Sequence, residues 1–430
     1  MLFNKISIII PTKDRESYLY FTLKTCINQE YKNYEIIVLD DGSTDNSIEM
    51  VKGLIKSHPQ IKLFENSDNL GMMENFEKGL NQIEEGYVIV LGGDDGLMPN
   101  SLAVMNNLIN DSNSQVITWP TCSFFYPGTK MPTGQLIYNI EKKGGKNQWK
   151  WIKSKDYLTR QCNQLFYVSD IETPMIYVKG IASIETIKEI KAKSPNNMFY
   201  QCSTPDGYSG IVLAGHLEKF VFYSTPLSLH GVSPTSAGVS YVKEGKEAKE
   251  ISKAFFEKAS NLKMHEKLGS VNYSPLISLM TADFVLMAND INKTSFTIDF
   301  EKLIVKAFSE LEDGLFAEGN LSRELDIIHK IALKTENIEL FSKLLSKKKR
   351  NKRYIFMGDG ISPRQVYLNA DEHHVFNIFD ASHFFYTLFN SRERFRISIL
   401  FNALLKSIKY FLASKRKGNK LKDYYVFSDN

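Results

Sequence analysis

The sequence contains few cysteines, and their spacing indicates no pair that would bind a metal or form a disulfide. Cys26, Cys122, Cys162 and Cys202 lie far apart, and no Cys-x-x-Cys occurs among the 430 residues. This pattern suggests neither a zinc site nor a disulfide framework. Reduced thiols in a cytoplasmic protein are therefore the simplest expectation.

Long apolar runs are also missing. No uninterrupted apolar segment approaches the roughly 20 residues that a bilayer-spanning helix needs. The first apolar run, Ile6–Ile10, is short and ends in the polar residues PTKDR, so we do not expect a signal peptide. The formal net charge of +4 is too small to indicate a nucleic-acid partner, and none is expected.

Two phosphate-binding motifs are absent as well. No G-x-G-x-x-G follows the first apolar run, and no G-x-x-x-x-G-K-[ST] occurs in the sequence. Rossmann dinucleotide proteins and P-loop proteins cradle phosphate with these motifs, so neither class is supported. What remains is an ordinary globular composition, 43% hydrophobic and 24% charged, of a length that suits two or three domains.

The first hundred or so residues alternate between apolar runs and helical spacing. Strands are expected at Ile6–Ile10, Glu35–Leu39, Ile61–Glu65 and Tyr87–Leu91, and the second and fourth of them are expected to be buried. Helical patterns with short loops separate them. The alternation predicts an α/β fold with a doubly wound, mostly parallel sheet.

Acidic residues follow three of these strands at one edge of the expected sheet: Asp14, Asp40, Asp41, Asp94 and Asp95. Each has a structural alternative, because aspartates also cap helices and form turns. Acid at three strand ends on one edge is harder to explain by capping. A nucleotide site uses carboxylates to bind base and ribose, and it then needs a cation for the diphosphate.

Four segments resemble, in order, the signatures of family 2 glycosyltransferases, which have the GT-A fold: ISIIIPTKDRESYL, YEIIVLDDGSTDNS, NLGMMENFEKG and VIVLGGDDGLMP. The resemblance implies transfer of a sugar, with inversion at the anomeric carbon, from a nucleotide diphosphate sugar. A UDP-sugar is expected, because uracil is the commonest base in the family. A glycan or lipid-linked acceptor in cell-surface polysaccharide synthesis is the usual setting.

The resemblance also assigns site residues. Those expected at the donor are Pro11, Thr12, Asp14, Asp40, Asp41, Asn69, Gly71 and Asp94. Asp94 and Asp95 match the acidic metal motif and are expected to hold Mg²⁺ or Mn²⁺. Gly92 stands where many members carry the first acid, so metal binding is expected to depend on Asp95, with Asp94 nearer the ribose and diphosphate. The assignment between these two aspartates stays open.

Two residues further along complete the expected site. An inverting transferase needs a base beside the acceptor hydroxyl, and Asp206, just before a helix expected at Tyr208–Leu217, fits that role. Its alternative is an acid in the first helical turn. GT-A enzymes often supply a late metal-binding histidine, and His230 is placed for it, although a lone histidine is more often a simple polar residue.

Three functions are compared. The favoured one is a metal-dependent, inverting glycosyltransferase. The first alternative is a non-catalytic scaffold of the same fold that binds sugar nucleotides, and Gly92 is the argument for it. The second is a nucleotidyltransferase, which would release pyrophosphate in place of a nucleoside diphosphate.

Three regions are expected: a GT-A catalytic domain over 1–240, a helical region over 241–345, and a basic C-terminal region over 346–430. Within the first, Thr173–Val178 is expected to be a strand. The last should end in an amphipathic helix between Arg392 and Lys420, which either docks on the protein or lies on an anionic membrane. Its flanking cations favour the membrane, which would place the protein peripherally on the cytoplasmic face.

Overall fold

The computed structural model describes residues 2–129, 132–139, 148–236, 261–313, 318–351, 359–362 and 364–390, with shorter pieces at 250, 253, 256–257, 400, 403–404 and 417–420. The chain forms two compact units, each built from separated stretches. Unit 1 comprises Met1–Ser154, Ile171–Pro234 and Phe356–Leu412; unit 2 comprises Lys155–Asp170, Thr235–Ile355 and Ala413–Asn430. The three regions expected from the sequence stay a prediction, since compactness alone does not define them.

The main sheet of unit 1 has the strand order β3-β2-β1-β4-β10-β6-β11-β9. Its strands are β1 Ile6–Thr12, β2 Tyr34–Asp40, β3 Ile61–Glu65, β4 Tyr87–Val90, β6 Val116–Thr118, β9 Trp149–Lys153, β10 Gly180–Ser183 and β11 Lys219–Tyr223. Only β10 and β9 run antiparallel to their neighbours. The predicted class, a doubly wound and mostly parallel α/β sheet, is confirmed.

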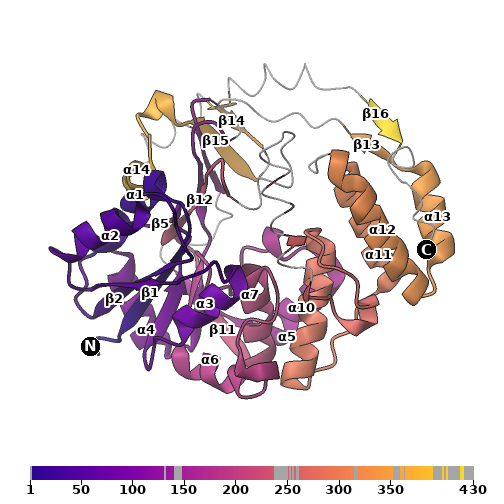
Figure 1. The fold of residues 1–430 in the computed structure, drawn as a ribbon, viewed down its shortest axis with the longest axis horizontal. Coiled ribbons are helices and arrows are strands. Elements are labelled where there is room, and N and C mark those ends of the chain that lie inside the picture. Colours follow the sequence, from indigo (N-terminus) through magenta and orange to yellow (C-terminus); the bar gives the residue numbers. More distant parts are fainter. Residues whose placement is uncertain are drawn as a thin grey trace. The chain divides into compact units, whose positions relative to one another are not determined.

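Helices follow the strands as the alternation predicts, and Figure 1 shows them around the indigo and purple strands. They are α1 Glu16–Ile27, α2 Ser47–Ile55, α3 Met72–Leu80, α4 Ser101–Ser112, α6 Ile184–Lys191 and α7 Pro205–His216. The apolar runs of β1, β2 and β4 are buried on both faces, and Ile8, Ile37 and Ile89 are fully inaccessible. This core fixes where those strands end, and therefore where the acids that follow them lie.

The expected strand at Thr173–Val178 is wrong. Tyr177 makes only an isolated bridge to Val90, and the strand begins at Gly180 and runs antiparallel. Two features stop a strand here: Pro174 has no N–H to donate, and Val178 has a φ of +62°. The N–H of Lys179 donates to the carbonyl oxygen of Tyr177 at 2.8 Å, which closes a tight turn at Val178.

A second sheet of unit 1 has the order β14-β15-β8-β7-β12-β5. Its strands are β5 Gly96–Leu97, β7 Cys122–Phe125, β8 Gln135–Asn139, β12 Ser228–Val232, β14 Gly360–Ile361 and β15 Gln365–Asn369. The sequence suggested no element between residues 360 and 390, so β14, β15 and the helix α14 (Ile378–Asn390) are new findings. The C-terminal part of the chain thus completes the sheet that carries His230.

Helix α14 packs against α1 and β5, and Figure 1 shows α14 beside α1. Ser382 Oγ donates to the carbonyl oxygen of Leu97 at 2.8 Å, and Lys24 Nζ of α1 lies 4.4 Å from the Phe379 ring centroid. Phe385 is fully buried in the same apolar cluster as Leu229 and Met98. The helix therefore supports the short strand that follows the Asp94–Asp95 turn.

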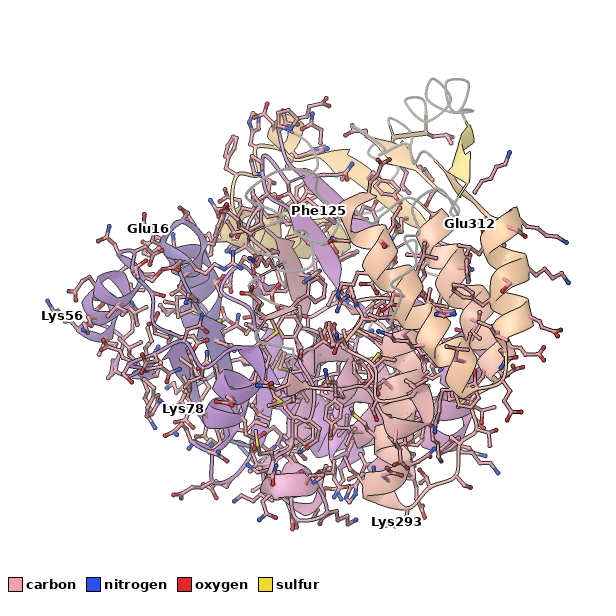
Figure 2. The ribbon with its side chains drawn as sticks, turned by 45° about the vertical axis from the view of Figure 1, so that its right-hand side comes forward. Glu16, Lys56, Lys78, Phe125, Lys293 and Glu312 are labelled. Carbon is pink, nitrogen blue, oxygen red and sulfur yellow. The ribbon has the colours of Figure 1, made fainter. Side chains whose placement is uncertain are left out.

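Unit 2 is mainly helical, as predicted for the C-terminal region. It contains most of α5 (Ser154–Gln164), together with α10 Ile277–Asn292, α11 Phe300–Glu312, α12 Glu318–Lys334 and α13 Ile338–Lys347. Glu310 accepts from the N–H groups of Ile277 and Ser278 at 2.7 and 2.8 Å and so caps the start of α10. Glu312, labelled in Figure 2 at the end of α11, pairs with Lys348 Nζ at 2.5 Å.

Two helices expected in the C-terminal half are not tested by the structure. Most of the expected helix over 247–262, and nearly all of the amphipathic helix between Arg392 and Lys420, lie outside the described residues. Across the part of the chain that the structure describes, no helix is long and apolar enough to cross a membrane.

Candidate active site

Polar residues from several segments of unit 1 gather where β1, β2 and β4 end. Thr12 at the end of β1 is in register with Asp40 at the end of β2. The turn after β4 is joined to β12 by a hydrogen bond between Asp95 and Gly231. The first turn of α7 brings Asp206 within electrostatic range of His230. The edge of the sheet predicted to carry the site therefore does carry these side chains.

Asp95 is the most enclosed of the acids. It is 0% exposed, its Oδ2 accepts from the Gly92 N–H at 2.6 Å, and its Oδ1 accepts from the Gly231 N–H at 2.8 Å. The hydroxyl of Tyr177 also hydrogen-bonds to this carboxylate. Burial, together with the nearby charge of Asp94, raises the pKa of Asp95 to about 6, although His230 and the two backbone N–H groups act in the opposite direction.

Glycines permit this close approach. A Cβ added at Gly231 would lie 1.7 Å from the carbonyl oxygen of Asp94, which no side chain can tolerate. The turn is also fixed from α1, because Thr22 Oγ1 donates to the carbonyl oxygens of Gly93 and Asp95 at 3.1 and 2.7 Å. The turn after β4 is thus held between β12 and α1.

Asp94 points to a different set of partners. Its Oδ2 accepts from the Ser233 hydroxyl at 2.6 Å, and Ser233 Oγ in turn accepts from Arg15 Nη1 at 3.0 Å. The carbonyl oxygen of Asp94 accepts from the Tyr126 hydroxyl at 3.3 Å. Asp94 is 6% exposed, so it too is largely enclosed. A chain of polar contacts therefore joins the β1–α1 loop to the turn after β4.

Asp40 and Thr12 offer buried oxygens that have no protein partner. Asp40 Oδ2 accepts from the N–H groups of Gly42 and Ser43 at 3.1 and 2.9 Å, but Asp40 Oδ1 and Thr12 Oγ1 are buried without a hydrogen bond. Unpaired buried oxygens are costly, so they are expected where a ligand supplies the partner. Pro11, also expected at the donor, precedes Thr12 in β1.

Asp41 instead holds the turn before α3. Its Oδ1 accepts from the Leu70 N–H at 2.7 Å and from Asn66 Nδ2 at 3.1 Å, and its Oδ2 accepts from the Gly71 N–H at 2.9 Å. Gly71 adopts a φ of +89°, which a glycine takes without strain. Asn69 is exposed in this turn. Asp41 therefore places the Asn69–Gly71 segment.

Asp14 joins two loops at the edge of the site. Its φ is +49°, its N–H donates to Ser43 Oγ at 2.8 Å, and its carboxylate accepts from the Thr44 N–H at 2.7 Å. Asp14 is exposed, so its carboxylate remains accessible to solvent on one side. The contacts show that it links the loop after β1 to the loop after β2.

Asp206 lies in the first turn of α7, which begins at Pro205, three residues before the expected helix start, and this is the placement that the structural alternative describes. Its Oδ1 is buried without a hydrogen bond. Burial raises the pKa of this carboxyl above its ordinary value of 3.8, while the Gly207 N–H and His230 lower it. The hydroxyls of Tyr177 and Tyr200 are close enough for Asp206 to raise their pKa values as well. A carboxylate with an unpaired buried oxygen suits proton transfer.

The fit to a divalent cation rests on Asp94, Asp95 and His230. Two adjacent carboxylates supply hard oxygen ligands of the kind that Mg²⁺ and Mn²⁺ prefer. Among the described residues, however, no group of three or more His, Cys, Asp or Glu side chains is arranged to hold a metal ion. The carboxylate chemistry fits, but a bound cation would need further oxygen ligands from its substrate.

The structure adds residues to the candidate site that the sequence reasoning missed. Tyr177, Ser233 and Gly231 contact Asp95 or Asp94, and none of them was expected at the site. All three lie more than eighty residues from the turn in the sequence, and no local pattern marks them. Arg15 stands inside the PTKDR segment, but its link to Ser233 depends on β12.

The α/β sheet carries acids at the ends of β1, β2 and β4, which is the edge where open α/β sheets bind their ligands. Residues 7–172 match the family model described as Glycosyl transferase family 2, and this part of the chain belongs to that family.

Relatives of known description are similar over part of their length. The chain is 34% identical over 122 residues to the cholesterol galactosyltransferase of Borreliella burgdorferi, covering 28% of this chain and 33% of that protein. It is 34% identical over 113 residues to the GalNAc(5)-diNAcBac-PP-undecaprenol beta-1,3-glucosyltransferase of Campylobacter jejuni, covering 26% and 37%. The chain therefore spans little more than a third of these curated relatives.

Among solved structures, S. aureus TarS 1–349 in complex with UDP-GlcNAc is 14% identical with a TM-score of 0.42, covering 79% of this chain and 90% of that one. A mannosyltransferase from Pyrobaculum calidifontis in complex with GDP-Man and Mn²⁺ has a TM-score of 0.36 at 12% identity, covering 80% and 86%.

Proposed function

We propose that this protein is an inverting glycosyltransferase that moves a sugar from a nucleotide diphosphate sugar, with a UDP-sugar expected first, to a glycan or lipid-linked acceptor. The observation that carries the proposal is that three buried oxygens of the candidate site, Thr12 Oγ1, Asp40 Oδ1 and Asp206 Oδ1, have no hydrogen-bond partner. They lie at the strand ends and helix start where this family would bind donor and acceptor.

The donor side is assigned to the ends of β1 and β2. Asp40 Oδ1 and Thr12 Oγ1 can take up N–H and O–H groups of a base and ribose, because each has unused hydrogen-bonding capacity. Asp14, Asn69 and Gly71 border this region through the loops that Asp14 and Asp41 hold together. Asp41 supports the donor site through the Asn69–Gly71 turn.

The acceptor side is assigned to Asp206. Its carboxylate takes the proton from an acceptor hydroxyl as that oxygen forms a bond to the anomeric carbon and the bond to the diphosphate breaks. The nucleoside diphosphate leaves with the bonding electron pair, so a single displacement inverts the anomeric centre. His230, within electrostatic range of both Asp206 and Asp95, contributes positive charge near these acids when protonated.

A divalent cation held by Asp94 and Asp95 would supply positive charge against the leaving diphosphate. Three hydrogen bonds from the chain, those of Gly92, Gly231 and Tyr177, already use most of the roughly four lone pairs of the Asp95 carboxylate. Asp95 therefore keeps about one lone pair for a cation, and Asp94 is the second proposed ligand. His230 is the third proposed ligand.

The test begins with thermal unfolding of the full chain in UDP and a panel of UDP-sugars, with and without Mn²⁺. A ligand that binds only the folded state must raise the unfolding temperature. Asp206→Asn should keep that rise and lose release of UDP from the stabilising UDP-sugar, with water or a short glycan as acceptor. Asp111→Asn, an exposed site at the end of α4, is the matched control.

The alternatives give different results. Unchanged UDP release by Asp206→Asn would remove Asp206 from the mechanism. Donor binding without any release by the wild-type protein would favour the non-catalytic scaffold, and release of pyrophosphate would favour a nucleotidyltransferase. If the metal lies on Asp94 and Asp95, Asp94→Ala and Asp95→Ala should each reduce the Mn²⁺-dependent part of the rise.

We also propose that the protein acts at the cytoplasmic face of an anionic membrane. Apolar residues at helical spacing between Arg392 and Lys420, flanked by cations, support this proposal from the sequence. In unit 1, Tyr20 on α1 and Phe376 just before α14 are exposed large side chains at 38% and 56%. The Campylobacter relative is named for an undecaprenol-linked acceptor, which would lie at such a surface.

A further inference from the structure

The space beside Gly92 is filled by a tyrosine from another part of the chain. A Cβ added at Gly92 would lie 2.6 Å from Tyr177 Oη, 2.9 Å from Asp95 Oδ2 and 3.2 Å from Asp94 Oδ1. Position 92 is where the family resemblance leads us to expect an acid. The hydroxyl of Tyr177 therefore leaves room only for glycine at position 92, because a larger side chain would collide with that hydroxyl.

The backbone on both sides of Tyr177 is fixed to the end of β4. The Val90 N–H donates to the carbonyl oxygen of Ile176 at 2.9 Å, and the Val178 N–H donates to the carbonyl oxygen of Val90 at 2.8 Å. The aromatic ring also packs on Phe76, with 6.0 Å between centroids. Tyr177 is thus positioned by the same strand that positions Asp94 and Asp95.

Backbone strain next to Tyr177 argues that this placement serves a function. Val178 is β-branched yet has a φ of +62°, a conformation that such residues rarely adopt. Its carbonyl oxygen accepts from Ser228 Oγ, which accepts from Trp119 Nε1 at 2.7 Å. A strained residue held by a buried network is characteristic of functional sites.

The chemistry of the hydroxyl limits what it can bind. A neutral phenol has one hydrogen, and in this structure the hydroxyl is hydrogen-bonded to the carboxylate of Asp95, which can only accept. The lone pairs that remain on Tyr177 Oη can only accept a hydrogen bond. Phosphate oxygens offer no hydrogen, so the group bound there must supply an O–H or N–H hydrogen, and the hydroxyls of the ribose and of the sugar are the donors nearest to the diphosphate.

We propose that Tyr177 stands in for the missing acid at position 92 and binds a hydroxyl group of the sugar nucleotide, either of the ribose or of the transferred sugar. The inference rests on the proposed function. Relative to an acid at position 92, a neutral tyrosine puts one negative charge fewer beside Asp94 and Asp95. The exchange keeps a hydrogen-bond acceptor in place without adding to their mutual repulsion or to the repulsion of the diphosphate.

The test is Tyr177→Phe in the full chain, which keeps the ring and removes the hydroxyl. Calorimetry with Mn²⁺ compares UDP, its 2′-deoxy and 3′-deoxy forms, and the UDP-sugar that stabilises the wild-type protein. We expect binding to weaken by about three- to tenfold, as for loss of one hydrogen bond. Tyr34→Phe is the matched control, because Tyr34 donates to the carbonyl oxygen of Ile27 at 3.2 Å at the opposite edge of the sheet.

The ligands identify which hydroxyl is bound. If Tyr177→Phe binds UDP more weakly than the wild type does and no longer prefers UDP to one of its deoxy forms, Tyr177 binds that hydroxyl of the ribose. If Tyr177→Phe binds only the UDP-sugar more weakly, Tyr177 binds a hydroxyl of the transferred sugar. Unchanged affinity for all ligands in Tyr177→Phe overturns the inference while leaving the proposed function intact. Failure of the wild-type protein to bind any of them overturns both.

A second variant tests the replacement itself. Gly92→Asp alone should abolish binding through the collision with Tyr177 Oη, whereas Gly92→Asp combined with Tyr177→Phe removes the closest contact. We expect the double variant to bind UDP more tightly than Tyr177→Phe does. Equal or weaker binding by the double variant would contradict the claim that Tyr177 occupies the place of an acid.

Discussion

The N–H of Gly231 donates to Asp95 Oδ1 at 2.8 Å, and this hydrogen bond joins β12 to the turn that follows β4. The two segments approach so closely that the α-carbon of Gly231 faces the carbonyl oxygen of Asp94 with no room for a side chain. Strand β12 carries His230 and leads directly to Ser233, so the same contact sets the distance between these residues and the two aspartates.

Gly231→Ala should therefore separate β12 from the turn. Its Cβ would lie 1.7 Å from a backbone oxygen, so the strand must shift, and we expect loss of UDP and Mn²⁺ binding together with a lower unfolding temperature. Gly53→Ala is the control, because nothing lies within 4 Å of a Cβ added there on α2. Alanine in that helix should stabilise by up to about 1 kcal/mol. Normal ligand binding by Gly231→Ala would show that the contact does not matter.

Asp41→Asn addresses the turn before α3. The carboxylate accepts three hydrogen bonds, and an amide nitrogen in place of one oxygen would face a donor such as the Gly71 N–H at 2.9 Å. We expect a loss of about 1–3 kcal/mol in the free energy of unfolding, measured with urea, and weaker UDP binding. A variant with wild-type stability but lost binding would instead indicate direct contact between Asp41 and the donor.

Strands β1, β2 and β4 could be predicted because their residues are buried on both faces, and continuous apolar runs survive in the sequence where no face meets water. The expected strand Ile61–Glu65 also matches β3 residue for residue, although β3 lies at the edge of the sheet and only Ile61 in it is buried. The acids at the strand ends followed from the sheet geometry. The sheet geometry did not indicate what each acid contacts. Asp41 was expected at the donor, and its hydrogen bonds go to residues 66–71.

The other parts of the site depend on contacts between distant residues. Tyr177 was expected inside a strand, but Pro174 and the turn at Val178 place it against Gly92. The helix α14 has a buried face only because Leu97 and Tyr138, far away in the sequence, lie against it. No local periodicity carries such information, since tertiary packing decides it.

Phe385→Ala tests whether α14 supports the site. Phe385 is fully buried, with its ring 6.1 Å from that of Tyr138, and the cavity left behind should cost about 3–5 kcal/mol. We expect weaker UDP binding as well, because α14 packs on the strand after the Asp94–Asp95 turn. Phe376→Ala, at a position that is 56% exposed, should change stability by less than about 0.5 kcal/mol. Equal urea midpoints for the two variants would contradict this role of α14.

Asp283 in unit 2 should make stability depend on pH. Burial raises its pKa from an ordinary 3.8 to about 7, although the hydrogen bond that it accepts from the His265 N–H acts to lower the pKa. Between these values the unfolded chain loses the proton and the folded chain keeps it, so this group lowers stability as pH rises through that window. The full effect above pH 7 is about 4 kcal/mol at most.

Asp283→Asn should remove that part of the pH dependence. Urea unfolding at about pH 4 and about pH 8 should show a variant that resembles the wild type in acid and exceeds it in base. Glu339→Gln, an exposed site on α13, controls for the loss of one charge. A constant difference between Asp283→Asn and wild type at both pH values would mean that Asp283 does not titrate in this window.

The last prediction concerns the segment between Arg392 and Lys420. Its flanking arginines and lysines are each worth about 1 kcal/mol near an anionic leaflet, and its apolar residues share one helical face. We expect the full chain to sediment with vesicles containing phosphatidylserine at low salt and to be released at high salt. Deleting residues 392–430 retains α14 and should abolish sedimentation, but it also removes Ala403, which is fully buried in the same apolar cluster as Phe385, so we expect UDP binding to weaken as it does in Phe385→Ala. A full-length protein that stays in the supernatant at low salt would identify this segment as a docking helix, because a helix packed on its own protein offers no apolar face to lipid.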